Sequence, residues 1–117
     1  MTLYCPDVNV WLALSVQEHI HHETAMRWLQ RVRLEERLIF MRYTQLGLLR
    51  LLMNPTVLNP PLAILEAWSV FDRWLMDPRV EFFPEPRSID NAFRQATAPF
   101  SHQAAAKWAE ERSHSLR

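Results

Sequence analysis

Residues 7–13 run Asp-Val-Asn-Val-Trp-Leu-Ala and follow the short apolar stretch of residues 3–5. This order predicts a strand that ends near Asp7 and an apolar helix that begins directly after it. In an open α/β sheet, ligands and metals bind at the carboxyl ends of the strands. An aspartate at this point can also cap the helix that follows. Taken alone, the motif supports a functional Asp7 and a purely structural N-cap equally well.

The composition narrows the class of protein. The chain has 117 residues, of which 49% are hydrophobic, and this suits one domain with one core. Its 13 basic and 13 acidic side chains balance. The balance gives no sign of a protein that coats nucleic acid, although a neutral total does not exclude a local basic groove. The single glycine, Gly47, argues against a glycine loop that binds phosphate.

The cysteine content, the apolar stretches and the N-terminal residues indicate the cellular compartment. Cys5 is the only cysteine, so no intramolecular disulfide can form, and a reducing cytosol is the natural setting. No stretch approaches the roughly 18 apolar residues that a membrane-spanning helix requires. Asp7 and Asn9 interrupt any signal-peptide pattern at the N-terminus. We therefore expect a cytoplasmic protein with no membrane partner.

Apolar spacing along the chain predicts alternating strands and helices. Strands are expected over residues 2–6, 38–41 and 80–83. Helices are expected over residues 8–16, 21–34, 45–53, 60–76, 88–97 and 102–113. Strands separated by helices predict a parallel sheet that is covered by helices.

Two of these helices carry more detailed expectations. Thr44 is the expected N-cap of the helix over residues 45–53. Pro60 and Pro61 are expected to begin the next helix, because proline is tolerated in a first turn. Its apolar stripe is expected to consist of Leu62, Leu65, Trp68, Phe71 and Leu75.

Several motifs together resemble the PIN-domain family, and within it the VapC-type toxins of bacterial toxin–antitoxin pairs. The first is the strand followed by residues 7–14, with residues 21–23 opening a helix that carries Trp28 and Leu29. The second is residues 43–55, and weaker similarity continues through Ala67-Trp68 and residues 74–80. The resemblance covers about residues 2–97, and the first two motifs are specific only in combination.

The resemblance implies a fold and an activity. The fold is an α/β, PIN-like three-layer arrangement with a central parallel sheet flanked by helices. The activity is metal-dependent endoribonuclease cleavage by acids at the carboxyl edge of the sheet, which hold Mg²⁺ or Mn²⁺. Such an ion can activate a water and stabilise charge on a phosphodiester. The implied partners are a cognate antitoxin, an RNA substrate and a second copy of the chain in a homodimer.

The family motifs match this sequence at particular positions. Asp7 matches the first metal-binding acid, and Asn9 matches the polar residue beside it. Thr44 matches the hydroxyl residue before the second acid, which is Gln45 here and adds no negative charge. Glu110 stands where a later metal-binding aspartate is expected, so the metal ligands expected from the resemblance are Asp7 and Glu110.

The similarity ends after Glu110. Residues 111–117 do not match the family's apolar helix, so we expect residues 1–117 to form a single, incomplete PIN-like domain that lacks its last strands. Residues 2–6 would then form a sheet edge, Mg²⁺ binding would be weak, and RNA cleavage would be slow or undetectable. The alternative function is a catalytically impaired remnant that binds an antitoxin or dimerises. The number of converging acids separates the two.

Several single features have structural alternatives. His19, His21, His22 and Glu23 resemble a metal site, but a helix start with solvated histidines explains them better. Cys5 is expected to be a buried hydrophobe. The tryptophans are expected in the core. Arg50 could equally be a solvated helix charge or a contact to RNA phosphate. Three acids are expected to be solvated or to cap helices: Asp72, Asp77 and Asp90.

Overall fold

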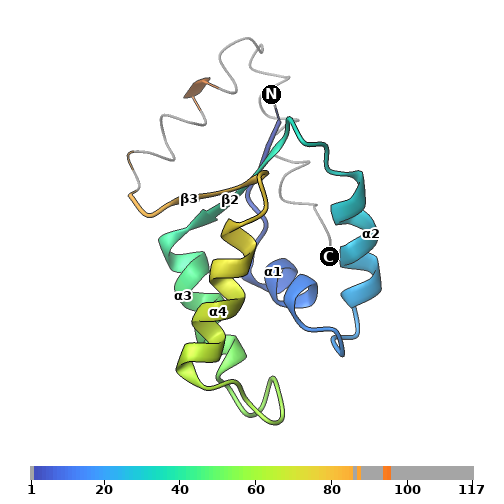
Figure 1. The fold of residues 1–117 in the computed structure, drawn as a ribbon, viewed down its shortest axis with the longest axis vertical. Coiled ribbons are helices and arrows are strands. Elements are labelled where there is room, and N and C mark those ends of the chain that lie inside the picture. The colour runs from blue at the N-terminus through green and yellow to red at the C-terminus, as the bar shows by residue number, and fades with distance from the viewer. Residues whose placement is uncertain (1, 86, 88–93, 96–117) are drawn as a thin grey trace.

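A computed structural model describes residues 2–85, 87 and 94–95. These residues form the elements β1 (Leu3–Tyr4), α1 (Val8–Ser15), α2 (His22–Arg31), β2 (Arg37–Met41), α3 (Arg42–Leu52), α4 (Ile64–Leu75) and β3 (Val80–Phe83) (Figure 1). The three strands make one parallel sheet in the order β1-β2-β3. The expected α/β class and element order are confirmed up to residue 83. The helices expected over residues 88–97 and 102–113 lie outside the described residues, apart from residues 94 and 95.

Strand β2 is the central strand of the described sheet. Leu38 pairs with Tyr4 on one side and with Val80 on the other. Leu38, Ile39 and Phe40 are all buried, and a continuous apolar run of this kind is typical of a parallel strand that is covered on both faces. Among the described strands, β1 pairs with β2.

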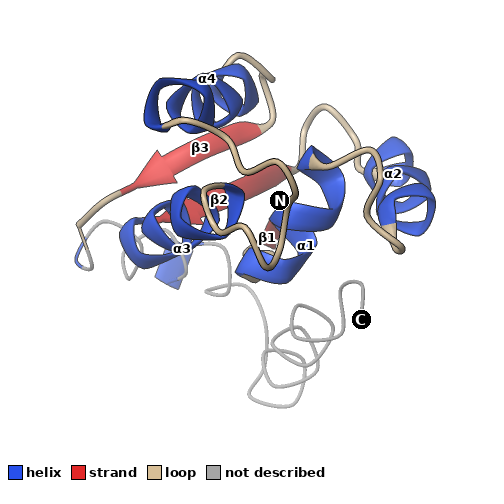
Figure 2. Ribbon diagram, turned by 90° about the horizontal axis from the view of Figure 1, so that it is seen from below, coloured by secondary structure: helices blue, strands red, loops and turns tan. Residues whose placement is uncertain are grey.

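Helix α1 lies in the middle of the helical layer, with α2 on one side and α3 and α4 on the other (Figure 1). Residues 10–14 are all buried, so the helix is covered nearly all round. Gly47 of α3 permits a close approach, because a Cβ there would lie 3.1 Å from Cγ2 of Val8. Figure 2 shows α3 and α4 beside the sheet and α2 set further out.

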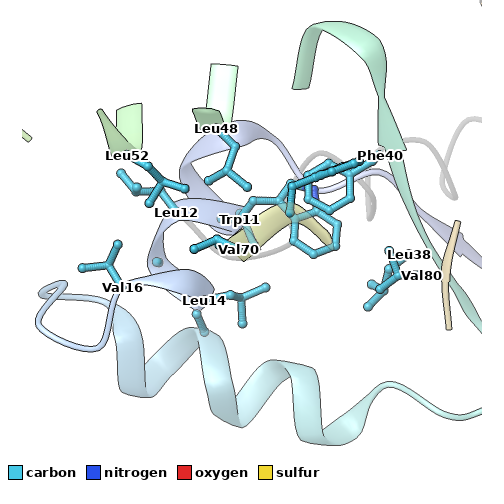
Figure 3. Close-up of a cluster of buried hydrophobic side chains, with 14 of the residues drawn as sticks. Trp11, Leu12, Leu14, Val16, Leu38, Phe40, Leu48, Leu52, Val70 and Val80 are labelled. Carbon is cyan, nitrogen blue, oxygen red and sulfur yellow. The ribbon is translucent and has the colours of Figure 1, made fainter. Parts of the chain in front are cut away.

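The core is built around Trp11. Its ring stacks on Phe40 with centroids 3.8 Å apart, and Trp74 meets it edge-on at 5.3 Å. Phe71 of α4 packs edge-on against Phe40 at 5.0 Å. Figure 3 shows Trp11 beside Phe40, with aliphatic side chains from α1, α3 and α4 around them. This aromatic group joins α1 and α4 to the central strand.

Two helix starts differ from expectation. Thr44 does not cap α3 but lies inside it, because the chain enters the helix directly from β2 at Arg42. Helix α4 begins at Ile64 and not at the two prolines. The preceding segment runs along the end of α3, where Leu62 N–H donates to the carbonyl of Leu52 at 2.9 Å.

The apolar face of α4 also differs from expectation. The helix buries Ala67, Val70 and Phe71, whereas Leu65 is 77% exposed, and Trp68 and Leu75 are 37% and 38% exposed. The sequence offers two apolar stripes on this helix. The inner one contains the small Ala67, which allows close packing. No described helix is long and apolar enough to cross a membrane.

Candidate functional site

Asp7 links β1 to α1 and is held by the helix start. Its extended backbone (φ −73°, ψ 172°) places Oδ1 to accept from the N–H groups of Asn9 and Val10, at 2.9 and 3.1 Å. The side chain is exposed, and Oδ2 accepts no hydrogen bond from the described residues. Asp7 is therefore an N-cap that still offers one carboxylate oxygen to a ligand, so the two roles considered for it are compatible.

A cavity of about 520 Å³ opens beside this carboxylate. Its described lining comes from the start of α1, the segment between α1 and α2, and the first turn of α2: Asp7, Asn9, Val10, Ala13, His19, His21, Thr24 and Ala25. Three of these side chains are buried and apolar, and the others are polar. The site therefore combines a carboxylate with a partly apolar hollow.

The histidines make specific hydrogen bonds, which the expectation of a solvated cluster did not include. His19 Nδ1 accepts from the N–H of His21 at 3.0 Å, and His22 Nδ1 donates to the carbonyl of Ala13 at 2.7 Å. Helix α2 begins only at His22, so His19 and Glu23 do not share a helix face. Among the described residues, no three His, Cys, Asp or Glu side chains could together hold a metal ion. The structural alternative to a histidine metal site is thus favoured.

The surroundings of His19 favour the neutral form of its ring. Burial lowers the pKa of His19, and the neighbouring His21 and His22 lower it further. Because Nδ1 accepts a hydrogen bond, the neutral ring carries its proton on Nε2. His19 therefore presents an oriented ring with one N–H donor at the cavity.

Thr44 and Gln45 lie in the first turn of α3, at the carboxyl end of β2. They are 1% and 2% exposed. Gln45 Oε1 accepts from Nη1 of Arg42 at 2.7 Å, and the Arg42 guanidinium lies 5.0 Å from the centre of the Phe82 ring. Thr44 Oγ1 is buried with no partner in the described part of the chain. Neither side chain is among the described lining of the cavity, and Glu110 lies outside the described residues.

The role of Arg79 is not evident from the sequence. Its guanidinium makes two contacts with the Asp77 carboxylate, at 2.7 and 3.0 Å, and donates to the carbonyls of Leu29 and Val32 at the end of α2. Hydrogen bonding from Arg79 lowers the pKa of Asp77. Asp77 is therefore a half-buried structural acid, which also accepts from the N–H of Arg79 at 2.9 Å, and of the two expectations, a solvated or a capping acid, it does not match the solvated one. Asp72 is exposed, as expected, and Asp90 lies outside the described residues.

The donor set can be compared with the needs of Mg²⁺. This ion prefers oxygen ligands and is usually held by one or two carboxylates while it keeps several waters. The described cavity offers Oδ2 of Asp7, the amide of Asn9 and the hydroxyl of Thr24. These groups fit a weakly held ion that retains most of its waters.

The fold and this site define a PIN-like α/β protein with an acid at the carboxyl end of its first strand. Comparison with known proteins agrees, since the chain is 39% identical over 103 residues to Ribonuclease VapC41 of Mycobacterium tuberculosis, strains CDC 1551 / Oshkosh and ATCC 25618 / H37Rv. The alignment covers 80% of this chain and 70% of that protein. No family model matches the chain. The chain belongs to the VapC-type family of PIN-domain toxins.

Proposed function

We propose that this protein is a metal-dependent endoribonuclease, the toxin of a toxin–antitoxin pair. The observation that carries the proposal is Asp7, which is fixed by its own helix start yet keeps Oδ2 available at a cavity. The name of the M. tuberculosis relative, a ribonuclease, supports the same activity. The cytosol is the compartment proposed for it.

Each residue has a proposed role. Asp7, with Glu110 by family resemblance, would hold Mg²⁺ or Mn²⁺, which when bound supplies an activated water and charge stabilisation. Asn9 would orient a metal-bound water or the substrate through its amide. Thr44 and Gln45 would shape the neighbouring strand end, where Gln45 fixes Arg42.

The experiment is a metal-dependent RNase assay on the full chain, comparing wild type, Asp7→Asn and Asp7→Ala. Asparagine caps helices about as well as aspartate, so Asp7→Asn should keep its stability but lose cleavage by about 100-fold or more. Asp7→Ala should lose the activity and also about 1 kcal/mol of stability. Comparing the two separates the chemical role of the carboxylate from its role as a cap.

Two outcomes would count against the proposal. Cleavage by Asp7→Asn at the wild-type rate would remove Asp7 from the chemistry. A wild-type protein that folds but cleaves no RNA with Mg²⁺ or Mn²⁺ would favour the alternative, a remnant that only binds partners. The slow rate expected from a site with few acids makes a sensitive assay with a long incubation necessary.

The proposed partners are a cognate antitoxin and a second copy of the chain. Support comes from the outer face of α4, where large apolar side chains are exposed: Ile64, Leu65, Trp68 and Leu75. Clustered exposed apolar residues of this kind mark interfaces. Sedimentation should detect a dimer. The double variant Leu65→Ser, Trp68→Ser should dimerise more weakly. A wild-type monomer at high concentration would contradict the homodimer.

A further inference from the structure

We propose that the cavity beside Asp7 binds one unpaired nucleobase of the RNA, adjacent to the phosphodiester that is cleaved. This inference rests on the proposed function and adds a substrate-recognition site to it. Proteins read single-stranded RNA by stacking splayed bases on rings and hydrogen-bonding their edges. The described lining of the cavity provides both kinds of contact.

The first observation is the apolar wall. Val10, Ala13 and Ala25 line the cavity and are at least 97% covered. Two of them are alanines, whose small side chains leave room for a flat ring to lie against the helices. The cavity volume of about 520 Å³ falls within the range of small-ligand pockets. These buried side chains close off the base of the cavity but present little surface of their own, so a bound base would contact mainly the rings and polar side chains of the lining.

The second observation is the pair of imidazoles. The rings of His19 and His21 lie 5.7 Å apart, and both line the cavity. The hydrogen bond from the His21 N–H fixes the His19 ring before any ligand arrives. Histidine is among the side chains on which RNA bases stack. A ring that is already oriented loses little freedom on binding.

The third observation is the polar edge. The Asn9 amide offers a donor and an acceptor, and the Thr24 hydroxyl offers both as well. Neither side chain is engaged in a hydrogen bond within the described residues. Both are therefore free to contact the edge of a base. Their position on opposite helices, α1 and α2, would let them read two points on that edge.

Charge favours a base over a phosphate in this cavity. Its described lining contains no lysine or arginine, and its one carboxylate, Asp7, repels anions. The neutral His19 adds a donor without adding a positive charge. A neutral, flat ligand with a polar edge is the occupant that this combination fits.

The test is NMR of the histidine ring signals of the full chain during titration with each ribonucleoside 5′-monophosphate. Ribose 5-phosphate is the control, because it has the sugar and phosphate but no base. At least one nucleotide should shift the signals of His19 and His21, and ribose 5-phosphate should not. Equal shifts with ribose 5-phosphate, or no shift with any nucleotide, would overturn the proposal.

Variants sharpen the test. Thr24→Val should weaken nucleotide binding severalfold while Thr24→Ser retains it. His19→Phe should keep more affinity than His19→Ala, because a flat ring remains. Gln17→Ala is the matched control on the same segment, since Gln17 is exposed and is not among the described lining. Equal losses in Gln17→Ala and His19→Ala would contradict the proposal.

The titration needs no cleavage, so its failure is distinguishable from failure of the proposed function. Nucleotide binding that is absent in a protein whose RNA cleavage depends on Asp7 would reject the base site alone. Base binding should also persist in Asp7→Asn, because the carboxylate is not required to hold a neutral base. Tighter binding in Asp7→Asn that ribose 5-phosphate shares would show that the ligand is held through its phosphate instead, because the substitution removes the charge that repels anions.

Discussion

Helices α1 and α4 are both rich in apolar residues, yet their apolar side chains differ in how far they are buried. In α1, residues 10–14 are all at most 5% exposed. In α4, Ile64 and Leu65 are 60% and 77% exposed. Both helices contribute an aromatic residue to the same cluster around Phe40. Apolar content therefore does not determine burial; position in the helical layer does.

The position of each helix explains the difference. Helix α1 follows the first strand and lies between α2 and α3, so neighbours cover most of its surface (Figure 1). Helix α4 lies against α3 and β3, and no other described element covers its outer side (Figure 2). Among the described residues, the outer face of α4 is thus a surface that a partner protein could cover, whereas residues 10–14 of α1 are already buried.

The largest expected effect tests the burial of α1. Trp11→Ala should lower the free energy of unfolding by about 3–5 kcal/mol, because it empties the centre of the aromatic cluster. Leu65→Ala on α4 should change it by about 0.5 kcal/mol or less, as an exposed substitution. Denaturant unfolding of both variants measures the contrast.

A milder variant keeps this comparison measurable if Trp11→Ala does not fold. Trp11→Phe retains a stacking ring on Phe40 and should lose less stability than the alanine variant. The comparison fails if Leu65→Ala, measured at a concentration where the protein is monomeric, costs as much as Trp11→Phe. Such a result would mean that the outer face of α4 is covered within the single chain.

The same contrast separates what the sequence predicts from what it does not. Helix α1 and strand β2 are predictable because they are apolar on all sides, so no choice of face is required. Helix α4 carries two apolar stripes, and local spacing cannot decide which one meets α3 and β3. That choice depends on Ala67 packing closely, which is a property of the assembled layer.

The site shows a similar division. Asp7 is predictable because its strand, cap and helix are adjacent in sequence. Arg79 contacts the end of α2 through Leu29 and Val32, which are 50 and 47 positions away in the sequence. No local sequence pattern predicts these contacts. The cavity brings His19 and Thr24 beside Asn9 only because α2 folds back on α1. The predicted roles of Gln45 and Glu110 remain predictions.

The second largest effect concerns the end of α4, where Asp77 and Arg79 tie it to α2. Asp77→Ala should lower the free energy of unfolding by about 1.5–3 kcal/mol, because it removes a charge-assisted contact and releases the guanidinium. Asp72→Ala is the matched control, because Asp72 is an exposed aspartate near the end of α4, and it should change the free energy of unfolding by about 0.5 kcal/mol or less. Equal effects of the two substitutions would contradict the structural role of Asp77.

This contact also predicts a pH dependence. The pKa of Asp77 is lowered in the folded protein, so its ionised form stabilises the fold above the ordinary carboxyl pKa of about 4. That stabilisation is lost as the pH falls through the lowered pKa. The stability difference between wild type and Asp77→Asn should therefore shrink below about pH 4, as measured by unfolding at several pH values. A difference that stays constant down to pH 2 would exclude this origin.

The smallest effect concerns the start of α4 and has the opposite sign. Helix α1 has a side-chain cap from Asp7, whereas the N-cap of α4 is Ala63, which has no side chain to accept a hydrogen bond. Glu66 already accepts from the Ala63 N–H at 2.8 Å, so half of a capping box is present. The Ala63 backbone is extended (φ −71°, ψ 161°), as an N-cap requires. Ala63→Ser should complete the box and raise the free energy of unfolding by about 0.5–1 kcal/mol in a thermal or denaturant unfolding experiment. Ala63→Val, which adds a side chain without an acceptor, should give no such gain. A gain from valine equal to that from serine would mean that side-chain contact, and not capping, limits the stability of this helix start.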